Sequence, residues 1–281
     1  MYTLLDGKAV SAKLRGKIKE NVEKYKNNNG KDIGLAVVMV GENPASAIYV
    51  RNKIKACEEV GIKSFSYYLP EKASQNDVER LVLSLVEDNA INGILVQLPL
   101  PEHINAEKVL GLIPAKKDVD GFSAENTGKL CLGEECLVAC TPHGVMKILE
   151  EYGVEVKGKR AVVVGRSNIV GKPMAMLLLN ADATVTVCHS KTKNLQEECQ
   201  NADILVAAIG KPKFITCEMV KDGAVVVDVG MNRDENGKLC GDVDFDKVKD
   251  KCSYITPVPG GVGPMTITML MFNTLQAAQR G

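Results

Sequence analysis

The sequence lacks net charge, long apolar runs and a secretory N-terminus, and each absence narrows the class of protein. Its 281 residues include 35 Lys and Arg against 35 Asp and Glu, so no long-range positive field attracts nucleic acid or anionic lipid. No apolar run reaches the ~20 residues that a membrane-spanning helix needs. Met1–Lys17 shows no basic region followed by an apolar stretch and a cleavage site. We therefore expect a cytoplasmic protein that acts on small molecules.

The sequence also lacks a CxxC pair, and its nine cysteines are an odd number, which argues against a disulfide framework. The cysteines lie in apolar or helical stretches, so we expect buried, reduced thiols. The one cluster, formed by Cys131, Cys136 and Cys140, does not have the usual zinc-site spacing. No metal site is predicted.

Strand-like runs alternate with amphipathic helical stretches along most of the chain, which is the pattern of a parallel sheet covered by helices. Most of these runs are continuous Val, Ile, Leu and Ala segments suited to burial on both faces. The fold class is therefore α/β, and Ser74 with Asp77 predicts a capping box at one helix start. The predicted strands are Ile33–Val40, Lys63–Leu69, Gly93–Leu98, Arg160–Val164, Ala183–Cys188, Asp203–Ala207 and Ala224–Asp228, and the predicted helices lie around 8–27, 44–60, 74–90, 142–152, 171–180 and 264–280.

Gly111–Leu137 is rich in Gly, Lys, Asp and Glu and has little apolar periodicity, which predicts an irregular boundary or the wall of a cleft. We divide the chain after this segment. Residues 1–140 form the first predicted domain and residues 141–263 the second. The last helix, about 264–281, is expected to return to the first domain.

A strand, a glycine turn and a helix follow one another between Lys159 and Leu179. In such a unit the backbone N–H groups and the helix start face a pyrophosphate. The motif is weak by itself, because Ser167 occupies the middle glycine of GxGxxG, and a purely structural turn is the alternative. The candidate cofactor-binding residues here are Gly165, Arg166, Ser167 and Ile169.

The end of the next strand indicates which dinucleotide binds. Enzymes that select NAD usually place an acidic residue there, but this chain has Cys188–Lys191 and no carboxylate. Ser190 and Lys191, together with Arg166, offer donors and positive charge for a 2′-phosphate. This favours NADP over NAD, although an ordinary solvated loop is the alternative.

Polar side chains in the first half suggest a catalytic site. Tyr49 and Lys53 stand four residues apart on a predicted helix and share one face, although a surface Tyr beside a solvated Lys would look the same. Gln97 follows a buried strand, and Asp118 and Asp120 lie in the predicted cleft wall, at positions where α/β proteins collect ligand groups. The Pro- and Gly-rich segment 256–266 suits close approach of the backbone to a planar ligand.

With these segments assembled, the chain resembles the bifunctional methylenetetrahydrofolate dehydrogenase/cyclohydrolase family over nearly its whole length. The resemblance implies two α/β domains around a cleft, the second a Rossmann-like domain with a mostly parallel sheet, and a homodimer formed largely through that second domain. The segments that carry it, in family order, are Tyr49–Lys53, Val96–Pro101, Lys117–Gly121, Cys140–Pro142, Gly165–Pro173 and Pro257–Thr266.

The resemblance implies two consecutive reactions of one-carbon metabolism, one of an oxidoreductase and one of a hydrolase, whose product serves purine biosynthesis. Methylene-tetrahydrofolate gives a hydride to NADP⁺, and the methenyl form is then hydrolysed to 10-formyl-tetrahydrofolate. The implied catalytic residues are Lys53, Tyr49 and Gln97. The implied substrate-binding residues are Tyr49, Asp120, Pro259, Gly260 and Gly261.

Lys53 is the expected proton acceptor in the hydration. Because an ordinary lysine titrates near pH ~10.4, this role needs an environment that favours the neutral amine, such as an apolar pterin and a cationic substrate. Gln97 can bond the amine without adding negative charge, and Tyr49 can orient it. Asp120 is expected to accept hydrogen bonds from the pterin and to be separated from Lys53 by the substrate.

One position departs from the family pattern. After Thr141-Pro142 the family often has Lys, whereas this chain has His143, which we leave out of the chemistry. The chain ends at Gly281, so the formyltransferase module of some larger relatives is not expected. A shikimate-type NADP-dependent dehydrogenase and a noncatalytic NADP-binding sensor are the alternative functions.

Overall fold

The computed structural model describes residues 1–280, and all of their side chains except those of residues 44 and 45. The chain forms two compact units: unit 1 comprises Met1–Ala12 and Thr141–Thr266, and unit 2 comprises Lys13–Cys140 and Ile267–Gly281. Helices α1 (Gly7–Asn29) and α10 (Val262–Arg280) each run from unit 1 into unit 2. The sequence-based division differs at the N-terminus, since Met1–Ala12 belongs to the unit of the second half.

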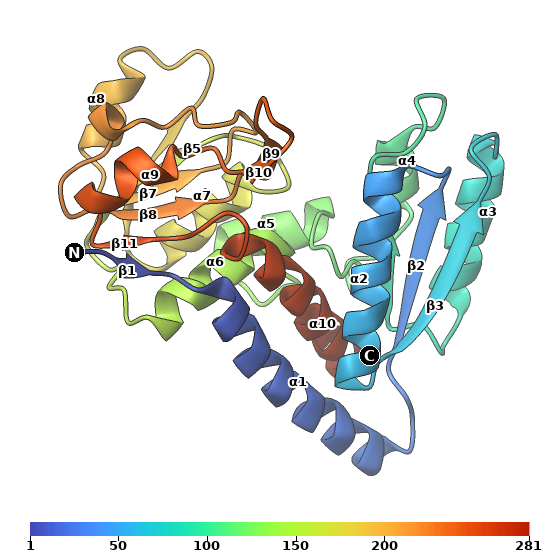
Figure 1. The fold of residues 1–281 in the computed structure, drawn as a ribbon. Helices are drawn as coiled ribbons and strands as arrows, with labels where there is room; N and C mark the ends of the chain where they lie inside the picture. Colours follow the sequence, from blue (N-terminus) through green and yellow to red (C-terminus); the bar gives the residue numbers. More distant parts are fainter. Residues whose placement is uncertain (281) are drawn as a thin grey trace. The chain divides into compact units, whose positions relative to one another are not determined.

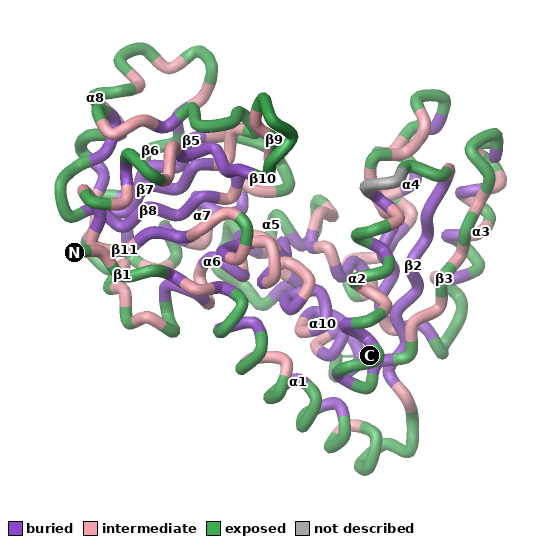
Figure 2. The backbone as a smooth tube through the Cα atoms, viewed as in Figure 1, coloured by how far each residue is buried: buried purple, intermediate pink, exposed green. Residues whose placement is uncertain are grey.

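Unit 1 is built on a six-stranded sheet with the order β1-β11-β8-β7-β5-β6, in which every pair is parallel. Strand β1 pairs with β11 at the edge, which is why the N-terminus belongs to this unit. The three central strands are buried along nearly their whole length, as Figure 2 shows in purple. The strands are β1 (Thr3–Leu4), β5 (Arg160–Val164), β6 (Thr184–Cys188), β7 (Ile204–Ala207), β8 (Val225–Asp228) and β11 (Tyr254–Ile255).

Helices and a small hairpin complete unit 1 (Figure 1). The longer helices begin near the predicted positions, and the hairpin is the only antiparallel pair among the named strands of the described chain. The helices are α6 (Cys140–Glu151), α7 (Gly171–Asn180), α8 (Leu195–Gln200) and α9 (Phe245–Val248), with 3-10 turns η1 (Cys217–Met219) and η2 (Lys249–Lys251), and the hairpin joins β9 (Asn232–Arg233) to β10 (Leu239–Cys240).

Unit 2 contains a three-stranded parallel sheet with the order β3-β2-β4. Helix α3 packs its apolar side, including Val78, Val82 and Leu85, into the core beside these strands. The predicted capping box of Ser74 and Asp77 is confirmed. The strands are β2 (Gly34–Val40), β3 (Lys63–Leu69) and β4 (Gly93–Val96), and the helices besides α1 and α10 are α2 (Pro44–Val60), α3 (Gln75–Glu87), α4 (Ala106–Gly111) and α5 (Ala124–Leu132).

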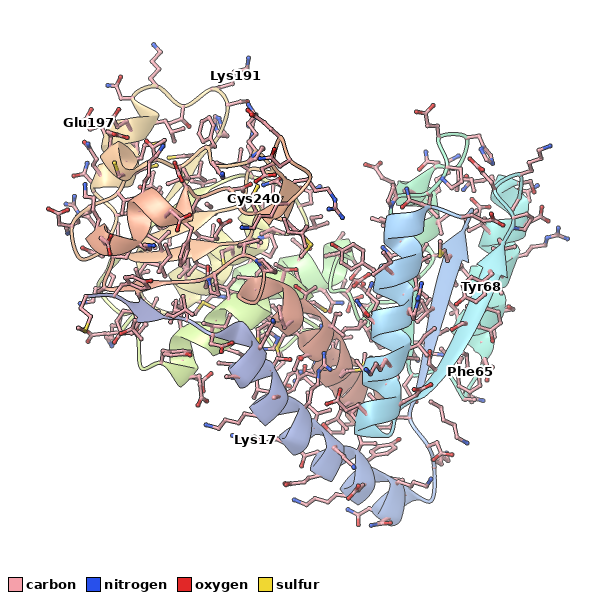
Figure 3. The ribbon with its side chains drawn as sticks, in the orientation of Figure 1. Lys17, Phe65, Tyr68, Lys191, Glu197 and Cys240 are labelled. Carbon is pink, nitrogen blue, oxygen red and sulfur yellow. The ribbon has the colours of Figure 1, made fainter. Side chains whose placement is uncertain are left out.

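The mostly parallel α/β fold class is confirmed, but some local predictions were wrong. Gly111–Leu137 is irregular only in part, because Ala124–Leu132 forms α5, which Ser123 caps at its start and Gly133 ends in a left-handed conformation. Strand β3, which is not one of the continuous apolar runs, was predicted with the observed bounds; it lies at the sheet edge and is only partly buried, and Tyr68, labelled in Figure 3, is 64% exposed. Cys131 is exposed rather than buried. No helix among residues 1–280 has the length and apolar character needed to cross a membrane.

Candidate active site

A lysine and a glutamine meet in unit 2. Lys53, on α2, donates a hydrogen bond from Nζ to Oε1 of Gln97 across 2.9 Å. Tyr49 lies one helical turn before Lys53 on the same face of α2 and is 39% exposed. The structure thus brings together two of the three side chains that the sequence proposed for catalysis, and it leaves the third accessible beside them.

Gln97 is held in place from both its backbone and its side chain. Its N–H donates to Val38 O at 2.8 Å, which extends the β2–β4 pairing by one residue, and its Nε2 donates to Leu98 O at 2.6 Å. Because Nε2 is occupied in this way, Oε1 is left to accept from Lys53. Strand β4 ends at Val96, two residues before the predicted end. Gln97 therefore follows the strand, and its side chain reaches Lys53 on α2.

Asp120 carries the perturbed carboxyl group of this site. Burial raises the pKa of Asp120 to about 6, while the nearby charge of Lys53 acts in the opposite direction. Asp120 as a whole residue is half-buried. Asp120 therefore lies within electrostatic range of Lys53 and is poorly hydrated, as expected of a group that binds a polar ligand edge.

Asp118, the other carboxylate of the motif, has a structural role. Its oxygens accept from the backbone N–H groups of Gly121 and Ser123 at 3.1 and 2.7 Å, and from Nδ2 of Asn126 at 3.0 Å. These bonds form the turn that follows Asp120. Ile94 N–H donates to Lys117 O, so the segment lies alongside β4.

Two further residues near Asp120 were not found from the sequence. Asn273, buried on α10, donates through Nδ2 to Val119 O at 2.9 Å and to Val138 O at 2.8 Å. The buried thiol of Cys140 donates to Val119 O, and burial raises its pKa, as does the charge of Asp120. Cys140 belonged to a quoted motif without a role, whereas Asn273 lies in a helix where no sequence signal distinguishes it.

The predicted dinucleotide turn lies at the carboxyl edge of the sheet in unit 1. Gly165 has φ +137°, and a Cβ there would lie 2.1 Å from Ala208 O; a Cβ on Gly171 would lie 2.2 Å from Gly165 O. Both glycines are therefore required by close backbone approach. Strand β6 lies on one side of β5 and β7 on the other, so this edge is a topological switch point, where open α/β sheets bind ligands.

The proposed phosphate-binding side chains share that edge. Val164 and Cys188 are partners in the β5–β6 register, so Arg166 and Ser190 follow neighbouring strand ends. Arg166, Ser190 and Lys191 are exposed, and Figure 3 shows Lys191 on the loop between β6 and α8. His189 and Thr192 form the turn that carries them: His189 N–H donates to Thr192 Oγ1, and Lys191 N–H to His189 Nδ1.

The remaining predicted cofactor residues also lie in the glycine turn. Ser167 Oγ accepts from the N–H groups of Val170 and Gly171 at 3.2 and 3.3 Å, so its hydroxyl helps to begin α7. Ile169 is 44% exposed in the same turn. The site fits a dinucleotide for three reasons. The glycine turn offers backbone N–H donors, α7 begins there, and Cys188–Lys193 contains donors but no carboxylate. All three features lie at the carboxyl edge of the sheet.

The predicted substrate segment Pro259–Gly261 is fixed by the N-terminus of its own unit. Lys8 N–H donates to Gly260 O at 3.1 Å, and Gly261 N–H donates to Pro257 O at 2.9 Å. Gly260 has φ +108°, and a Cβ on Gly7 would lie 1.8 Å from Gly261 O. The sequence did not indicate this support by Gly7 and Lys8.

His143, the departure from the family pattern, is partly buried at the start of α6. Burial lowers its pKa to about 4, and Lys147 one turn on contributes in the same direction. The imidazole is therefore neutral at physiological pH.

Together, the parallel sheet with its glycine turn and the Lys–Gln–Asp group define a dinucleotide-dependent α/β enzyme. Residues 5–120 match the model of the tetrahydrofolate dehydrogenase/cyclohydrolase catalytic domain, and residues 139–281 match that of the NAD(P)-binding domain of the same family. The chain belongs to the tetrahydrofolate dehydrogenase/cyclohydrolase family.

Individual relatives agree with this assignment. The chain is 62% identical to the bifunctional protein FolD of Campylobacter concisus over 98% of its own length and 97% of the relative. The solved structure of a FolD methylenetetrahydrofolate dehydrogenase/cyclohydrolase from Campylobacter jejuni has a TM-score of 0.97 at 53% identity and covers 100% of this chain and 99% of that one. A Trypanosoma brucei FolD complexed with NADP cofactor and inhibitor has a TM-score of 0.94 at 41% identity, with coverage of 99% and 98%.

Proposed function

We propose that this enzyme oxidises methylene-tetrahydrofolate to the methenyl form with NADP⁺ and hydrolyses the methenyl form to 10-formyl-tetrahydrofolate, using Lys53, Gln97 and Tyr49. The proposal depends most on one observation, the hydrogen bond from Lys53 Nζ to Gln97 Oε1 in the catalytic-domain half of the family match. Family membership argues against both alternatives. A shikimate-type dehydrogenase can use a Lys–Asp pair, but it would not account for Tyr49, Gln97 and Pro257–Thr266 together.

In the first reaction the chain's main contribution is positioning. Bound NADP⁺ supplies the hydride acceptor. The glycine turn Gly165–Gly171 brings backbone donors and the start of α7 to the pyrophosphate, and Arg166, Ser190 and Lys191 provide charge and donors for the 2′-phosphate. Holding the two reacting carbons at near-attack distance accounts for much of the rate.

In the second reaction water adds to the cationic methenyl carbon, and one proton must leave the water as its oxygen bonds. The ring then opens: the bond from this carbon to N5 breaks, the remaining hydroxyl proton passes to N5, and the formyl group stays on N10. Lys53 Nζ is the proposed acceptor. Gln97 Oε1 accepts a hydrogen bond from one N–H of the amine. In the neutral amine the lone pair therefore points away from Gln97, where it can accept the proton of the water. Tyr49, one turn away, orients the substrate and the amine.

Asp120 is proposed to anchor the pterin by accepting from its N–H edge. This role is supported by the incomplete hydration that raises the carboxyl pKa to about 6, because binding replaces the missing water with donors. Pro259, Gly260 and Gly261 remain predicted folate contacts, supported by the close backbone packing within their own unit.

A homodimer formed through unit 1 is also proposed. Strand β6 is an edge strand that pairs only with β5 in the described sheet. Three apolar side chains around it and around α7 are exposed: Ile169 at 44%, Leu179 at 51% and Val187 at 38%. Exposed apolar side chains together with an open strand edge favour association with a second copy.

The proposed compartment is the cytoplasm, where the free thiols of all nine cysteines would stay reduced. There the formyl product would supply one-carbon transfers such as those of purine biosynthesis. Fractionation of the source cells with an antibody against the protein would test the compartment.

The function is tested by adding the purified protein to methylene-tetrahydrofolate and NADP⁺, and then separately to methenyl-tetrahydrofolate alone. We expect NADPH and methenyl absorbance to rise in the first assay and methenyl absorbance to decay in the second. A protein that binds NADPH but catalyses neither reaction would support the sensor alternative, and NADPH formation from shikimate would support the other.

A further inference from the structure

A buried aspartate outside the predicted site holds a loop at the cofactor edge of unit 1. Asp242 is fully buried. Its Oδ2 accepts from Ile209 N–H at 2.6 Å and from Gly210 N–H at 3.0 Å, and its Oδ1 accepts from Lys211 N–H at 2.9 Å. Asn232 Nδ2 donates to the same Oδ1 at 2.8 Å. One carboxylate therefore satisfies three successive backbone donors and one side-chain amide.

The loop that Asp242 holds borders the glycine turn of the proposed dinucleotide site. It follows β7, and Ala208 N–H donates to Val164 O at the end of β5 at 2.8 Å. Ala208 O is the atom that a Cβ on Gly165 would approach to 2.1 Å. The loop 208–211 and the glycine turn therefore touch at the switch point of the sheet, where any dinucleotide must enter.

A second buried aspartate holds Asp242 in turn. Asp228, at the end of β8, accepts from the N–H groups of Asp242 at 2.9 Å and Val243 at 2.8 Å. A Cβ on Gly241 would lie 1.8 Å from Asp228 Oδ2, and one on Gly230 would lie 2.3 Å from Asp242 Oδ1. The absence of a side chain at these two glycines therefore makes room for the two carboxylates. The close packing leaves the carboxylates little space to shift.

Three consecutive N–H groups that converge on one point form a nest that binds anions. Here the protein fills the nest with its own carboxylate, so these donors cannot rotate toward solvent or toward a ligand. A wall fixed in this way before the ligand arrives lowers the entropic cost of binding.

We propose that Asp242 is a positioning residue for NADP⁺, which fixes the loop 208–211 as a preformed wall of the crevice. This rests on the proposed function for the identity of the ligand. Asparagine keeps the size of the side chain, but it has a single acceptor oxygen and would turn an amide toward donors that are already present. The replacement of Asp242 by asparagine should therefore weaken cofactor binding. It should leave the cofactor-free hydrolysis of methenyl-tetrahydrofolate intact.

The test uses Asp242→Asn in the full-length enzyme. We expect the KM for NADP⁺ and the Kd for NADPH, followed by its fluorescence, to rise at least about tenfold, as loss of a charged hydrogen bond implies. We also expect kcat at saturating NADP⁺ and the hydrolysis rate to stay within about threefold. The matched control is Asp203→Asn, because Asp203 accepts from Arg160 N–H beside the opposite, amino end of β7; this variant should leave NADP⁺ binding unchanged.

Parallel loss of both activities in Asp242→Asn, or an unchanged Kd for NADPH, would overturn the proposal. If this variant does not fold, hydrogen exchange of the wild-type enzyme decides: the amides of residues 209–211 should be protected before any cofactor is added, and fast exchange that only NADPH slows would contradict a preformed wall. A wild-type enzyme that binds NADPH but oxidises no folate would refute the proposed function, whereas the effect of Asp242→Asn on NADPH binding would still be measurable.

Discussion

Lys53 Nζ and Gln97 Oε1 lie 2.9 Å apart, and this hydrogen bond connects the middle of α2 to the residue that follows β4. The two residues are far apart in the sequence, and each belongs to a different kind of element. Their contact gives the amine a fixed direction that a solvated lysine does not have. It also places the charge of Lys53 where it acts on the carboxyl group of Asp120. The chemistry of hydration should therefore depend on this lysine more than on any other cation of α2.

The first prediction separates the two reactions. Lys53→Met should lower the rate of methenyl-tetrahydrofolate hydrolysis by about a hundred- to ten-thousand-fold, since a proton acceptor is lost while the side-chain length is kept. The intrinsic hydride step should fall much less, because it needs no proton acceptor. The measurement is methenyl hydrolysis beside NADPH formation, with circular dichroism to verify the fold.

The control for this variant is Lys55→Met, which changes an exposed lysine two positions further along α2 and should leave both rates near wild type. Hydrolysis that persists in Lys53→Met would mean that another group takes the proton.

The second prediction concerns cofactor choice. NADP⁺ should be preferred over NAD⁺, and Arg166→Ala should weaken NADP⁺ binding more than NAD⁺ binding, by roughly 1–3 kcal/mol, because a charge-assisted contact to the 2′-phosphate is lost. The kcat/KM values for both cofactors measure this difference. Arg160→Ala, at the amino end of the same strand, should change neither; an equal or better kcat/KM of the wild type with NAD⁺ would disprove the preference.

The third prediction follows from Asp120. Burial raises its pKa from 3.8 to about 6, and the anion is the form that accepts from the pterin, so the KM for folate should increase as the pH falls below about 6. Asp120→Asn should bind folate weakly at every pH and lose this dependence. Steady-state kinetics between pH 5 and 8, at ~25 °C, would show a flat folate KM in both proteins if Asp120 is outside the site.

Asp120 should also affect the stability of the fold: its anionic form favours folate binding but lowers the free energy of unfolding. Because its folded-state pKa exceeds the ordinary value, the folded protein binds more protons than the unfolded chain between about pH 4 and 6, and the free energy of unfolding declines as pH rises through that window. Asp120→Asn should therefore melt no lower than wild type at pH 7. A clear drop in its Tm would show that the carboxylate supports the fold rather than the ligand.

The fourth prediction tests the dimer. The wild type should elute with the mass of two chains in light scattering, and Val187→Lys should shift the population toward the monomer, since it places a charge on the exposed edge strand β6. Leu83→Lys, at a residue of α3 that is 47% exposed, should leave the mass unchanged. A wild-type monomer, or a dimer insensitive to Val187→Lys, would refute an interface on β6.

The sequence was sufficient for the features that depend on local periodicity and short motifs. Apolar runs predicted β5 and β7 nearly to the residue, and the Ser74–Asp77 spacing predicted its capping box. It also placed Gly165, where φ +137° and contact with Ala208 leave no room for a Cβ. These are properties of residues close together in the chain, or of a backbone conformation that one residue type alone allows.

Only the tertiary structure decided the rest. Asp118 and Asp120 look alike in the sequence, but one is satisfied by the turn that follows it and the other is left near Lys53. Asn273, Asp242 and the pairing of β1 with β11 show no local signal, because their partners are distant in the chain. The function of a polar side chain depends on which donors and charges surround it after folding, and contacts of such long sequence separation are absent from any local pattern.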